Sequence, residues 1–408
     1  MMFTAGLAAD ILFYSFSEWI LYAQNTHIQE LGGTEKWANV FPIFHWSFIP
    51  WSFYLVLAVC FGYMLHVKKT RRQKFSEACR PILKEKTDGF FGRIIDLIAV
   101  FALVAGTATT FSLATPLMSK IINDLFGVNF NETLMTIIII LITCVIYTYS
   151  LLHGFKGISA LANLCVYLFG LILMIFLIFG GYFKEILGYS VTSFWRMLSH
   201  FFELATFTDP KHTSNFPQDW TIFYWAYWLV WSVATPFFIG NISKGRTVKQ
   251  VILGGYFCGV GSTIISFMIL GNYSFAQQIS GSVDFLTIYS QSGNLYEIVM
   301  LIIKSMPMPQ LILGLVLITM VCFYATSFDS IAFIAACYSY KELKENESPH
   351  RMVQLMWCIL LIVLPIALIF SESSMANLQS VSIIAAFPLG ICVILIIASF
   401  FVDVNQKR

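Results

Sequence analysis

Long apolar runs, separated by short polar stretches, recur from one end of the sequence to the other. A helical run of about 20 such residues crosses a hydrocarbon core that is about 30 Å thick. Backbone polar groups in that core must be satisfied within the segment, and strand-like alternation is absent, so we expect helices. The pattern predicts an all-α membrane protein with ten transmembrane helices. The predicted spans are residues 2–23, 42–66, 93–120, 133–153, 157–182, 219–240, 249–275, 309–338, 351–371 and 377–402.

The loops between these spans carry an uneven distribution of positive charge. With a cytoplasmic N-terminus, the inner loops and the C-terminal tail hold 18 of the 24 Lys and Arg. This bias agrees with the positive-inside rule. We therefore expect both termini in the cytoplasm and the chain in the plasma membrane of a bacterium, which is the inner membrane if the organism is Gram-negative. The basic loop 67–93 is either a topology anchor or a contact for anionic membrane lipid.

The spans divide into two halves of five, which we take as residues 1–182 and 219–402. Residues 183–218 are expected to join them as an external amphipathic connector, and residues 403–408 to form a cytoplasmic tail. Because five is odd, the second half crosses the membrane in the sense opposite to the first. Transporters built from inverted repeats have this organisation.

The first span of each half contains residues that interrupt a helix. They are Ala5–Gly6 in the first half and Ser232, Thr235 and Pro236 in the second. Discontinuous helices at matching positions are typical of the substrate sites of inverted-repeat transporters. The G-x-x-x-G pattern at Gly255–Gly259 is interpreted as close helix packing.

The composition excludes most other classes of protein. Charged residues make up only 11% of the chain, against about 25% in a soluble domain. The seven histidines form no H-E-x-x-H, no phosphate-binding G-x-x-x-x-G-K-[ST] occurs, and the nine cysteines form no C-x-x-C pair. We therefore expect no enzymatic activity, no cofactor other than a coupling ion, and no nucleic-acid partner.

Two segments are rich in aromatic residues. The segment WTIFYWAYWLVW carries a stripe about 100° wide, which consists of Trp220, Tyr224, Tyr227, Trp228 and Trp231. The segment HWSFIPWSFY contains Trp46, Trp51 and Tyr54. Pro50 is expected to interrupt the helix there and to re-aim these rings.

These rings allow two interpretations. An interfacial aromatic belt suits Trp46, Trp220 and Trp225, near the outer helix ends. A ligand box suits Trp228 and Trp231, which lie deeper in the span. Aromatic faces attract a weakly hydrated cation such as a trimethylammonium group, each by ~0.5–2 kcal/mol when desolvated.

The run WTIFYWAYWLVW followed by NISKGRT resembles the signature helix of the betaine/choline/carnitine transporter family. HWSFIPWSFY resembles the other aromatic helix of that family, and SLATPL, FTDP and FPQDWT are similar to its carnitine/γ-butyrobetaine antiporter branch. The resemblance covers essentially the whole chain. It implies a LeuT-like core of two inverted five-helix repeats, usually assembled as a homotrimer. Members normally have twelve spans, and this sequence is expected to start at the third.

The resemblance also implies the function. We expect secondary active transport of a quaternary ammonium compound, such as carnitine, betaine or choline, with ion-coupled uptake as the mode. The alternatives are a precursor/product exchanger of the carnitine type, a non-transporting sensor and a truncated remnant.

The same resemblance assigns roles to individual residues. Four of them match the cation-binding box of the family: Trp46, Trp51, Tyr54 and Trp228. Tyr227 and Trp231 match nearby substrate contacts, and Tyr227 stands where the family usually has Trp.

Asp10 is a candidate for coupling. It stands where the family usually has the last glycine of an unwound stretch, and a similar Asp is typical of members that resemble proton-coupled choline transporters. An ionised Asp at membrane depth costs roughly 2.5–3.5 kcal/mol, so Asp10 suits a proton carrier or a counter-charge for choline; a structural pair is the alternative. Glu18 and Asp329 are further acids in the spans, and we expect each to pair structurally.

Sodium is the other candidate coupling ion. Phe323, Thr326 and Ser327 match the half of a sodium site that the eighth span contributes in sodium-coupled relatives. Hydroxyl and carbonyl oxygens suit a hard cation, although such hydroxyls also form bonds between helices. Thr4 and Leu7 differ from the family's partner positions on the first span.

A second sodium site is less well supported by the resemblance. Thr107, Thr109 and Thr110 are candidates to line it, but Ala234 stands where the family contributes Phe. Cys165 stands where the ion-independent carnitine antiporter has a cationic Arg, so exchange without an ion is not supported by that position.

Overall fold

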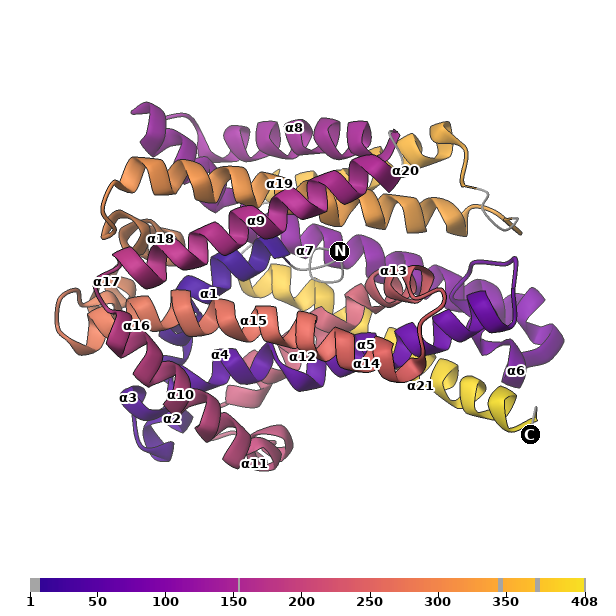
Figure 1. Cartoon of the computed structure of the whole chain (residues 1–408), viewed down its shortest axis with the longest axis horizontal. Helices are drawn as coiled ribbons and strands as arrows, with labels where there is room; N and C mark the ends of the chain where they lie inside the picture. The colour runs from indigo at the N-terminus through magenta and orange to yellow at the C-terminus, as the bar shows by residue number, and fades with distance from the viewer. Residues whose placement is uncertain (1–7, 153–154, 344–347, 371–374, 407–408) are drawn as a thin grey trace.

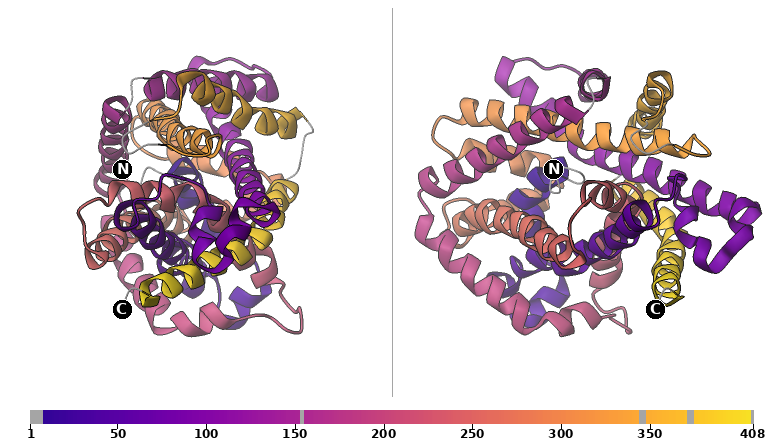
Figure 2. Two further views of the ribbon diagram at one scale, coloured as in Figure 1. Left: turned by 90° about the vertical axis from the view of Figure 1, so that its right-hand side faces the viewer. Right: turned by 45° about the vertical axis from the view of Figure 1, so that its right-hand side comes forward.

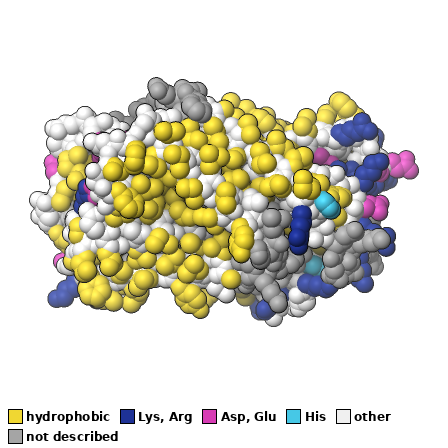
Figure 3. All heavy atoms as spheres, turned by 90° about the horizontal axis from the view of Figure 1, so that it is seen from above, with side chains coloured by type: hydrophobic (Ala, Val, Ile, Leu, Met, Phe, Trp, Pro, Cys, Tyr) yellow, Lys and Arg dark blue, Asp and Glu magenta, His cyan; other side chains and the backbone are white. Residues whose placement is uncertain are grey.

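The computed structural model describes residues 8–152, 155–343, 348–370 and 375–406, and every regular element in these ranges is a helix. Most of the long helices run along the long axis of the molecule and form one bundle (Figures 1 and 2). Hydrophobic side chains cover the middle of the face in Figure 3, whereas charged side chains gather toward its two ends. An apolar band between two charged ends suits a protein that crosses a membrane.

Within the described ranges, eight helical segments are long and apolar enough to cross a membrane: Thr34–Val67, Phe90–Phe126, Glu132–Tyr149, Ala160–Phe179, Val248–Ile279, Pro309–Tyr338, Arg351–Leu368 and Gln379–Gln406. A bent pair, Pro217–Val233 and Thr235–Ile242, makes a ninth if it is one span. These nine overlap, in order, nine of the ten predicted spans. The first predicted span contains helix α1, but it begins within residues 1–7, which lie outside the described ranges. The predicted total of ten is therefore not confirmed.

The first half of the chain contains α1 (Ala8–Ala23), α2 (Thr26–Leu31), α3 (Thr34–Trp37), α4 (Val40–His45), α5 (Phe48–Gly62), α6 (Arg80–Leu83), α7 (Phe90–Phe126), α8 (Glu132–Leu152) and α9 (Phe155–Phe179). A π turn, Tyr63–Val67, continues α5, and two 3₁₀ turns, Ser76–Cys79 and Lys84–Asp88, flank α6. Residues 183–218, which we expect to form a connector, contain α10 (Phe183–Ser199) and α11 (Phe201–Thr206).

The sixth predicted span overlaps a π turn, Pro217–Thr221, and α12 (Ile222–Val230), which a 3₁₀ turn, Trp231–Val233, separates from α13 (Thr235–Ile242). The next span alternates α-helix with π turns at Tyr256–Val260 and Phe267–Gly271. The remaining helices are α14 (Val248–Gly255), α15 (Gly261–Ser266), α16 (Asn272–Ile279), α17 (Phe285–Ser292), α18 (Leu295–Lys304), α19 (Pro309–Tyr338), α20 (Arg351–Phe370) and α21 (Met375–Gln406).

Helix α1 lies at the centre of the bundle. From Ala9 to Ala23 every residue except Leu21 is buried, and the helix contacts α4, α7, α16, α18 and α19. A helix that is buried on all sides is expected to be apolar all round. Two carboxyl groups, those of Asp10 and Glu18, are nevertheless buried on α1, so other parts of the protein must satisfy them.

Two spans are interrupted near their middle. The span Thr34–Val67 breaks at Trp46 and Ser47, between α4 and α5. The break predicted at Pro50 was wrong, because Pro50 lies in the first turn of α5, where the missing N–H has no helical partner to lose. The bend predicted from Ser232, Thr235 and Pro236 is confirmed, since the helices on either side of Ala234 meet at 48°. Ala5–Gly6 lie outside the described residues.

The third span of each half makes a matching set of contacts. Helix α7 contacts α8, α20 and α21, whereas α19 contacts α20, α8 and α9. Exchanging α7 with α19, α8 with α20 and α9 with α21 converts one set into the other. The contact of α1 with α19 likewise has a counterpart in the contact of α12 with α7. The packing therefore has the approximate symmetry that two related halves would produce.

Candidate functional site

The break at Trp46 and Ser47 decides where the rings of that span point. On a continuous helix, Trp46 and Trp51 would lie about 140° apart around the axis, because each residue turns the helix by about 100°. The break removes this constraint. Its free carbonyl, on Trp46, accepts a hydrogen bond of 2.7 Å from Oγ1 of Thr263 on α15. A neighbouring span therefore stabilises the interrupted backbone.

Four aromatic side chains meet at this break, and we call them the ring cluster: Trp46, Trp51, Tyr54 and Trp228. The ring of Trp228 on α12 lies 5.6 Å from that of Trp46, 5.5 Å from that of Trp51 and 5.1 Å from that of Tyr54, centroid to centroid. All four side chains are buried. Trp228 meets Trp46 and Trp51 edge to face, and its ring is tilted by 47° to that of Tyr54. The ring cluster therefore joins one span of each half.

The belt interpretation is wrong for Trp46, which is completely buried. Trp220 and Trp225 are half-buried, as the belt interpretation allows. Trp231 begins the turn that follows α12, and its ring lies 6.4 Å from that of Phe328 on α19.

Several polar atoms next to the rings are buried without a partner. The indole N–H groups of Trp51, Trp228 and Trp231 make no hydrogen bond within the described part of the protein. A buried donor left unsatisfied costs roughly 1–3 kcal/mol. These three N–H groups are therefore available to a polar group or to water that enters the site.

A second arrangement links α1, α12 and α7. The hydroxyl of Tyr227 donates a hydrogen bond to Oδ2 of Asp10, and it lies 2.6 Å from Oγ1 of Thr110. Because the single hydroxyl proton of Tyr227 is given to Asp10, Thr110 must donate to the Tyr227 oxygen. The other carboxyl oxygen of Asp10 has no partner among the described residues. Tyr324 donates to the backbone carbonyl of Thr110 at 3.1 Å.

Glu18 pairs with neighbouring side chains, as expected. Its Oε1 accepts a hydrogen bond of 2.6 Å from Tyr22, and its Oε2 accepts one of 2.7 Å from the indole of Trp46. This second bond attaches Glu18 directly to the ring cluster, a contact that sequence reasoning missed. His45, also missed, lies next to Trp46 in the sequence and contacts Tyr22; its position in the motif HWSFIP was the available signal. The side chain of Asp329 lies outside the described residues.

The candidate sodium ligands occupy α19 and α7. Oγ1 of Thr326 donates to the carbonyl of Phe323 at 2.9 Å. Sγ of Cys165 lies 3.8 Å from the same Oγ1 of Thr326. The hydroxyl of Thr107 donates to the carbonyl of Leu103 at 2.7 Å. Phe323, Thr326 and Ser327 are all buried, as are Thr107, Thr109 and Thr110. The positions on the first span, Thr4 and Leu7, lie outside the described residues.

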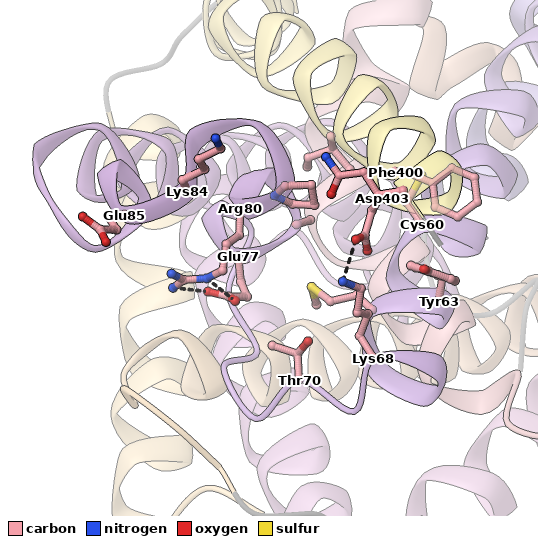
Figure 4. Close-up of a pocket in the computed structure, with 15 residues that line it drawn as sticks. Cys60, Tyr63, Lys68, Thr70, Glu77, Arg80, Lys84, Glu85, Phe400 and Asp403 are labelled. Carbon is pink, nitrogen blue, oxygen red and sulfur yellow. Dashed lines mark hydrogen bonds and ion pairs between the residues drawn. The ribbon is translucent and has the colours of Figure 1, made fainter. Parts of the chain in front are cut away.

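A separate cavity of about 460 Å³ opens near the end of the bundle that carries α6 (Figure 4). It lies between α5, α6 and α21 and shares no lining residue with the ring cluster. Lys68 and Asp403 form an ion pair across it at 2.5 Å, and Arg80 pairs with Glu77 beside it. Its lining contains three basic and three acidic side chains. These charges balance, so the cavity is not selective for an anion or for a cation by charge.

The chain is similar to known membrane transporters along its whole length. Residues 1–408 match the family described as "BCCT, betaine/carnitine/choline family transporter". A carnitine transporter from Acinetobacter baumannii is 28% identical over 97% of this chain and 72% of its own length. The uncharacterized transporter YeaV of Escherichia coli is 24% identical over 98% of this chain and 83% of its own length. The glycine betaine transporter OpuD of Bacillus subtilis is 30% identical over the whole of this chain and 78% of its own length.

The resemblance identified from the aromatic motifs is thus confirmed across the chain. The family and the three relatives of this chain are membrane transporters and not enzymes. The chain belongs to the betaine/carnitine/choline family of transporters, a multi-pass membrane protein that moves a quaternary ammonium compound across the membrane.

Proposed function

We propose that the ring cluster binds the trimethylammonium group of the substrate, with Tyr227 and Trp231 contacting the substrate nearby. The observation that carries this proposal is the position of Trp228. Its ring centroid lies within 5.6 Å of the centroids of three rings on the span Thr34–Val67. A trimethylammonium group has no N–H to donate and is weakly hydrated, so aromatic faces meet its charge better than polar ligands do. The rings contact one another, so a substrate enters only when they separate.

The proposed substrates are carnitine, glycine betaine and choline, which share this headgroup. Two relatives are named as carnitine and glycine betaine transporters, and both of these compounds also carry a carboxylate. The unpartnered indole N–H groups of Trp51, Trp228 and Trp231 are suitable donors to such an oxygen. Choline carries a hydroxyl at that end, which the same donors can satisfy.

Replacing Trp228 with Ala is predicted to weaken binding of every quaternary ammonium ligand. The loss of one desolvated cation–π contact raises Kd by roughly 3- to 30-fold. Trp225→Ala, three residues earlier on the same helix and outside the ring cluster, is the matched control and should leave Kd unchanged. Quenching of tryptophan fluorescence by choline, glycine betaine and carnitine measures both variants. Equal affinities in Trp228→Ala and the parent protein would remove Trp228 from the site.

The shape of the ring cluster depends on Gly259. A methyl group at this position would come within 2.6 Å of the ring of Trp51, and one at Gly255 would come within 2.0 Å of the side chain of Leu55. The close packing predicted from the G-x-x-x-G pattern is therefore present. A methyl group at Gly261, two residues further on, would meet no atom within 4 Å.

Gly259→Ala is predicted to displace the ring of Trp51 and to raise Kd for quaternary ammonium ligands by roughly 5- to 150-fold, as expected for overpacking of 1–3 kcal/mol. Gly261→Ala adds the same methyl group to open space, and alanine is the better helix former, so its affinity and stability should match or exceed those of the parent. The two variants are compared by the same fluorescence titration and by thermal unfolding in detergent. If they bind equally well, the ring of Trp51 does not contribute to the site.

We further propose that a proton at Asp10 couples uptake to the proton gradient. The support comes from two departures from the usual family residues, Asp10 in place of Gly and Tyr227 in place of Trp, which hydrogen-bond to each other from different helices. Asp10 forms no ion pair with Lys or Arg in the described ranges, so gaining a proton breaks no salt bridge. Sodium held by Phe323, Thr326, Ser327, Thr107 and Thr110 is the alternative coupling ion.

Asp10→Asn is predicted to retain substrate binding but to lose accumulation driven by a proton gradient, because an amide accepts the bond from Tyr227 but does not titrate. Asp10→Gly, which restores the usual family residue, should have the same effect. Uptake of labelled choline, betaine and carnitine into proteoliposomes is measured under imposed proton and sodium gradients, with the exposed Glu297→Gln as control.

Three results would contradict coupling at Asp10. The first is proton-driven accumulation that persists in Asp10→Asn. The second is accumulation by the parent protein under a sodium gradient alone, which favours sodium as the coupling ion, bound by the candidate residues on α19 and α7. The third is transport that occurs only from substrate-preloaded vesicles, which indicates exchange.

We also propose the arrangement in the membrane. Residues 1–182 and 219–402 act as two inverted repeats, joined by the external connector 183–218, as the exchanged contacts of α7 and α19 support. The end that carries α6 and the last turns of α21 faces the cytoplasm, with residues 403–408. Lys and Arg gather there (Figure 3), as the positive-inside rule requires. The protein then resides in a bacterial plasma membrane, where a homotrimer is the proposed assembly.

A further inference from the structure

A continuous chain of polar side chains runs from the start of the sixth predicted span to Glu18. Oγ1 of Thr221 lies 3.0 Å from Nε2 of His45, and Nδ1 of His45 lies 3.0 Å from the hydroxyl of Tyr22. Tyr22 donates to Oε1 of Glu18 at 2.6 Å. All four side chains are buried. Thr221 ends the turn Pro217–Thr221, two residues after the exposed Asp219, so the chain begins close to the surface.

The protons along this chain have only one consistent arrangement when Glu18 is ionised and His45 is neutral. Tyr22 has a single hydroxyl proton and gives it to Glu18, so its oxygen accepts from Nδ1–H of His45. A neutral His45 then has a bare Nε2, which accepts the hydroxyl proton of Thr221. Every bond therefore points toward Glu18. Each hydrogen bond in the chain therefore has one donor and one acceptor. A proton can be transferred along a chain in which every bond meets this condition.

The far end of the chain reaches the proposed substrate site. Oε2 of Glu18 accepts the indole N–H of Trp46 at 2.7 Å, and the ring of Trp46 lies 5.6 Å from that of Trp228. A hydrogen bond to an ionised carboxylate is roughly twice as strong as one to a neutral group. Protonation of Glu18 therefore weakens the attachment of Trp46, one of the rings that must move apart before a substrate enters.

Of the side chains described near Glu18, only His45 can carry a positive charge, and its Nδ1 lies 3.8 Å from Oε1 of Glu18. The titratable side chains that face it are Tyr14 and Tyr22 on α1, His45 on α4 and Tyr224 on α12. The ring of Tyr224 is stacked on that of His45 with centroids 5.0 Å apart. Among the described residues, no Lys or Arg forms an ion pair with Glu18. The other carboxyl group on α1, that of Asp10, belongs to the separate Tyr227–Thr110 arrangement.

We propose that Glu18 is a second proton-binding site of this transporter, loaded from the outer side through Thr221, His45 and Tyr22, and that its loading releases Trp46 so that the ring cluster opens outward. This inference rests on the proposed role of the ring cluster and is independent of Asp10.

The transfer step is balanced. One proton from external water binds to the oxygen of Thr221 as the Thr221 hydroxyl proton moves to Nε2 of His45. The Nδ1 proton of His45 moves to the oxygen of Tyr22, and the hydroxyl proton of Tyr22 moves to Oε1 of Glu18. Thr221, His45 and Tyr22 keep their proton counts, and His45 changes tautomer. Glu18 becomes neutral, and the external water loses one proton.

Tyr22→Phe tests the route, because it removes one hydroxyl and preserves the ring. Tyr14→Phe is the matched control, since Tyr14 is equally buried on the same helix and its hydroxyl has no partner in the described structure. The initial rate of choline uptake into proteoliposomes is measured against external pH. Tyr22→Phe should reduce the acceleration at acidic external pH by about tenfold or more, the size expected for one lost hydrogen bond to a charged group. Tyr14→Phe should follow the parent profile.

Glu18→Gln tests the site itself. The amide oxygen can still accept the indole N–H of Trp46, but the side chain does not take up a proton. This variant should bind choline, as measured by fluorescence, and the acceleration of its uptake at acidic external pH should be about tenfold or more below that of the parent, as in Tyr22→Phe, while the response that depends on Asp10 remains. Coincident pH profiles for Tyr22→Phe and Tyr14→Phe, or a parent-like profile for Glu18→Gln, would overturn the inference. Failure of the ring cluster itself would appear separately, as unchanged binding in Trp228→Ala.

Discussion

The contact of Trp228 with the rings of the span Thr34–Val67 is the interaction on which the rest of the site depends. Two helix interruptions produce it. One, at Trp46 and Ser47, allows rings from opposite sides of a helix to face the same partner, and the other ends α12 next to Trp228. Each interruption frees backbone groups that lipid cannot satisfy, so it must be buried in protein. The bond from Thr263 to the carbonyl of Trp46 meets this requirement.

Four buried acids of this protein, Asp10, Glu18, Glu77 and Asp403, are stabilised in two different ways. Near the end that carries α6, they are paired with cations, as Glu77 is with Arg80 and Asp403 is with Lys68. In the centre of the bundle, Asp10 and Glu18 are held by hydroxyl and indole donors. A carboxylate held by a cation resists protonation, whereas one held by neutral donors can be neutralised without stranding a buried charge. The central acids are therefore the ones suited to proton exchange.

Burying carboxyl groups on α1 also has a consequence for coupling. Glu18 accepts a hydrogen bond from Trp46, which belongs to the ring cluster. Asp10 accepts one from Tyr227, which directly precedes Trp228 on α12. A rigid aromatic site alone binds a methylated cation but does not respond to a gradient. Placing titratable groups one hydrogen bond away from the rings allows charge and ring position to change together.

The sequence by itself determined the order of nine of the ten predicted spans, the bend around Ala234 and the side chains that form the ring cluster. Long apolar runs and helical spacing are local properties, and the aromatic motifs are long enough to identify a family. Only the tertiary structure decided that the first break lies at Trp46 and not at Pro50, because proline is tolerated in a first turn. It also decided that Glu18 bonds Trp46 and that Asp10 bonds Tyr227, 217 residues away. Such partners come from different helices, and the packing of the bundle, which no local pattern records, brings them together.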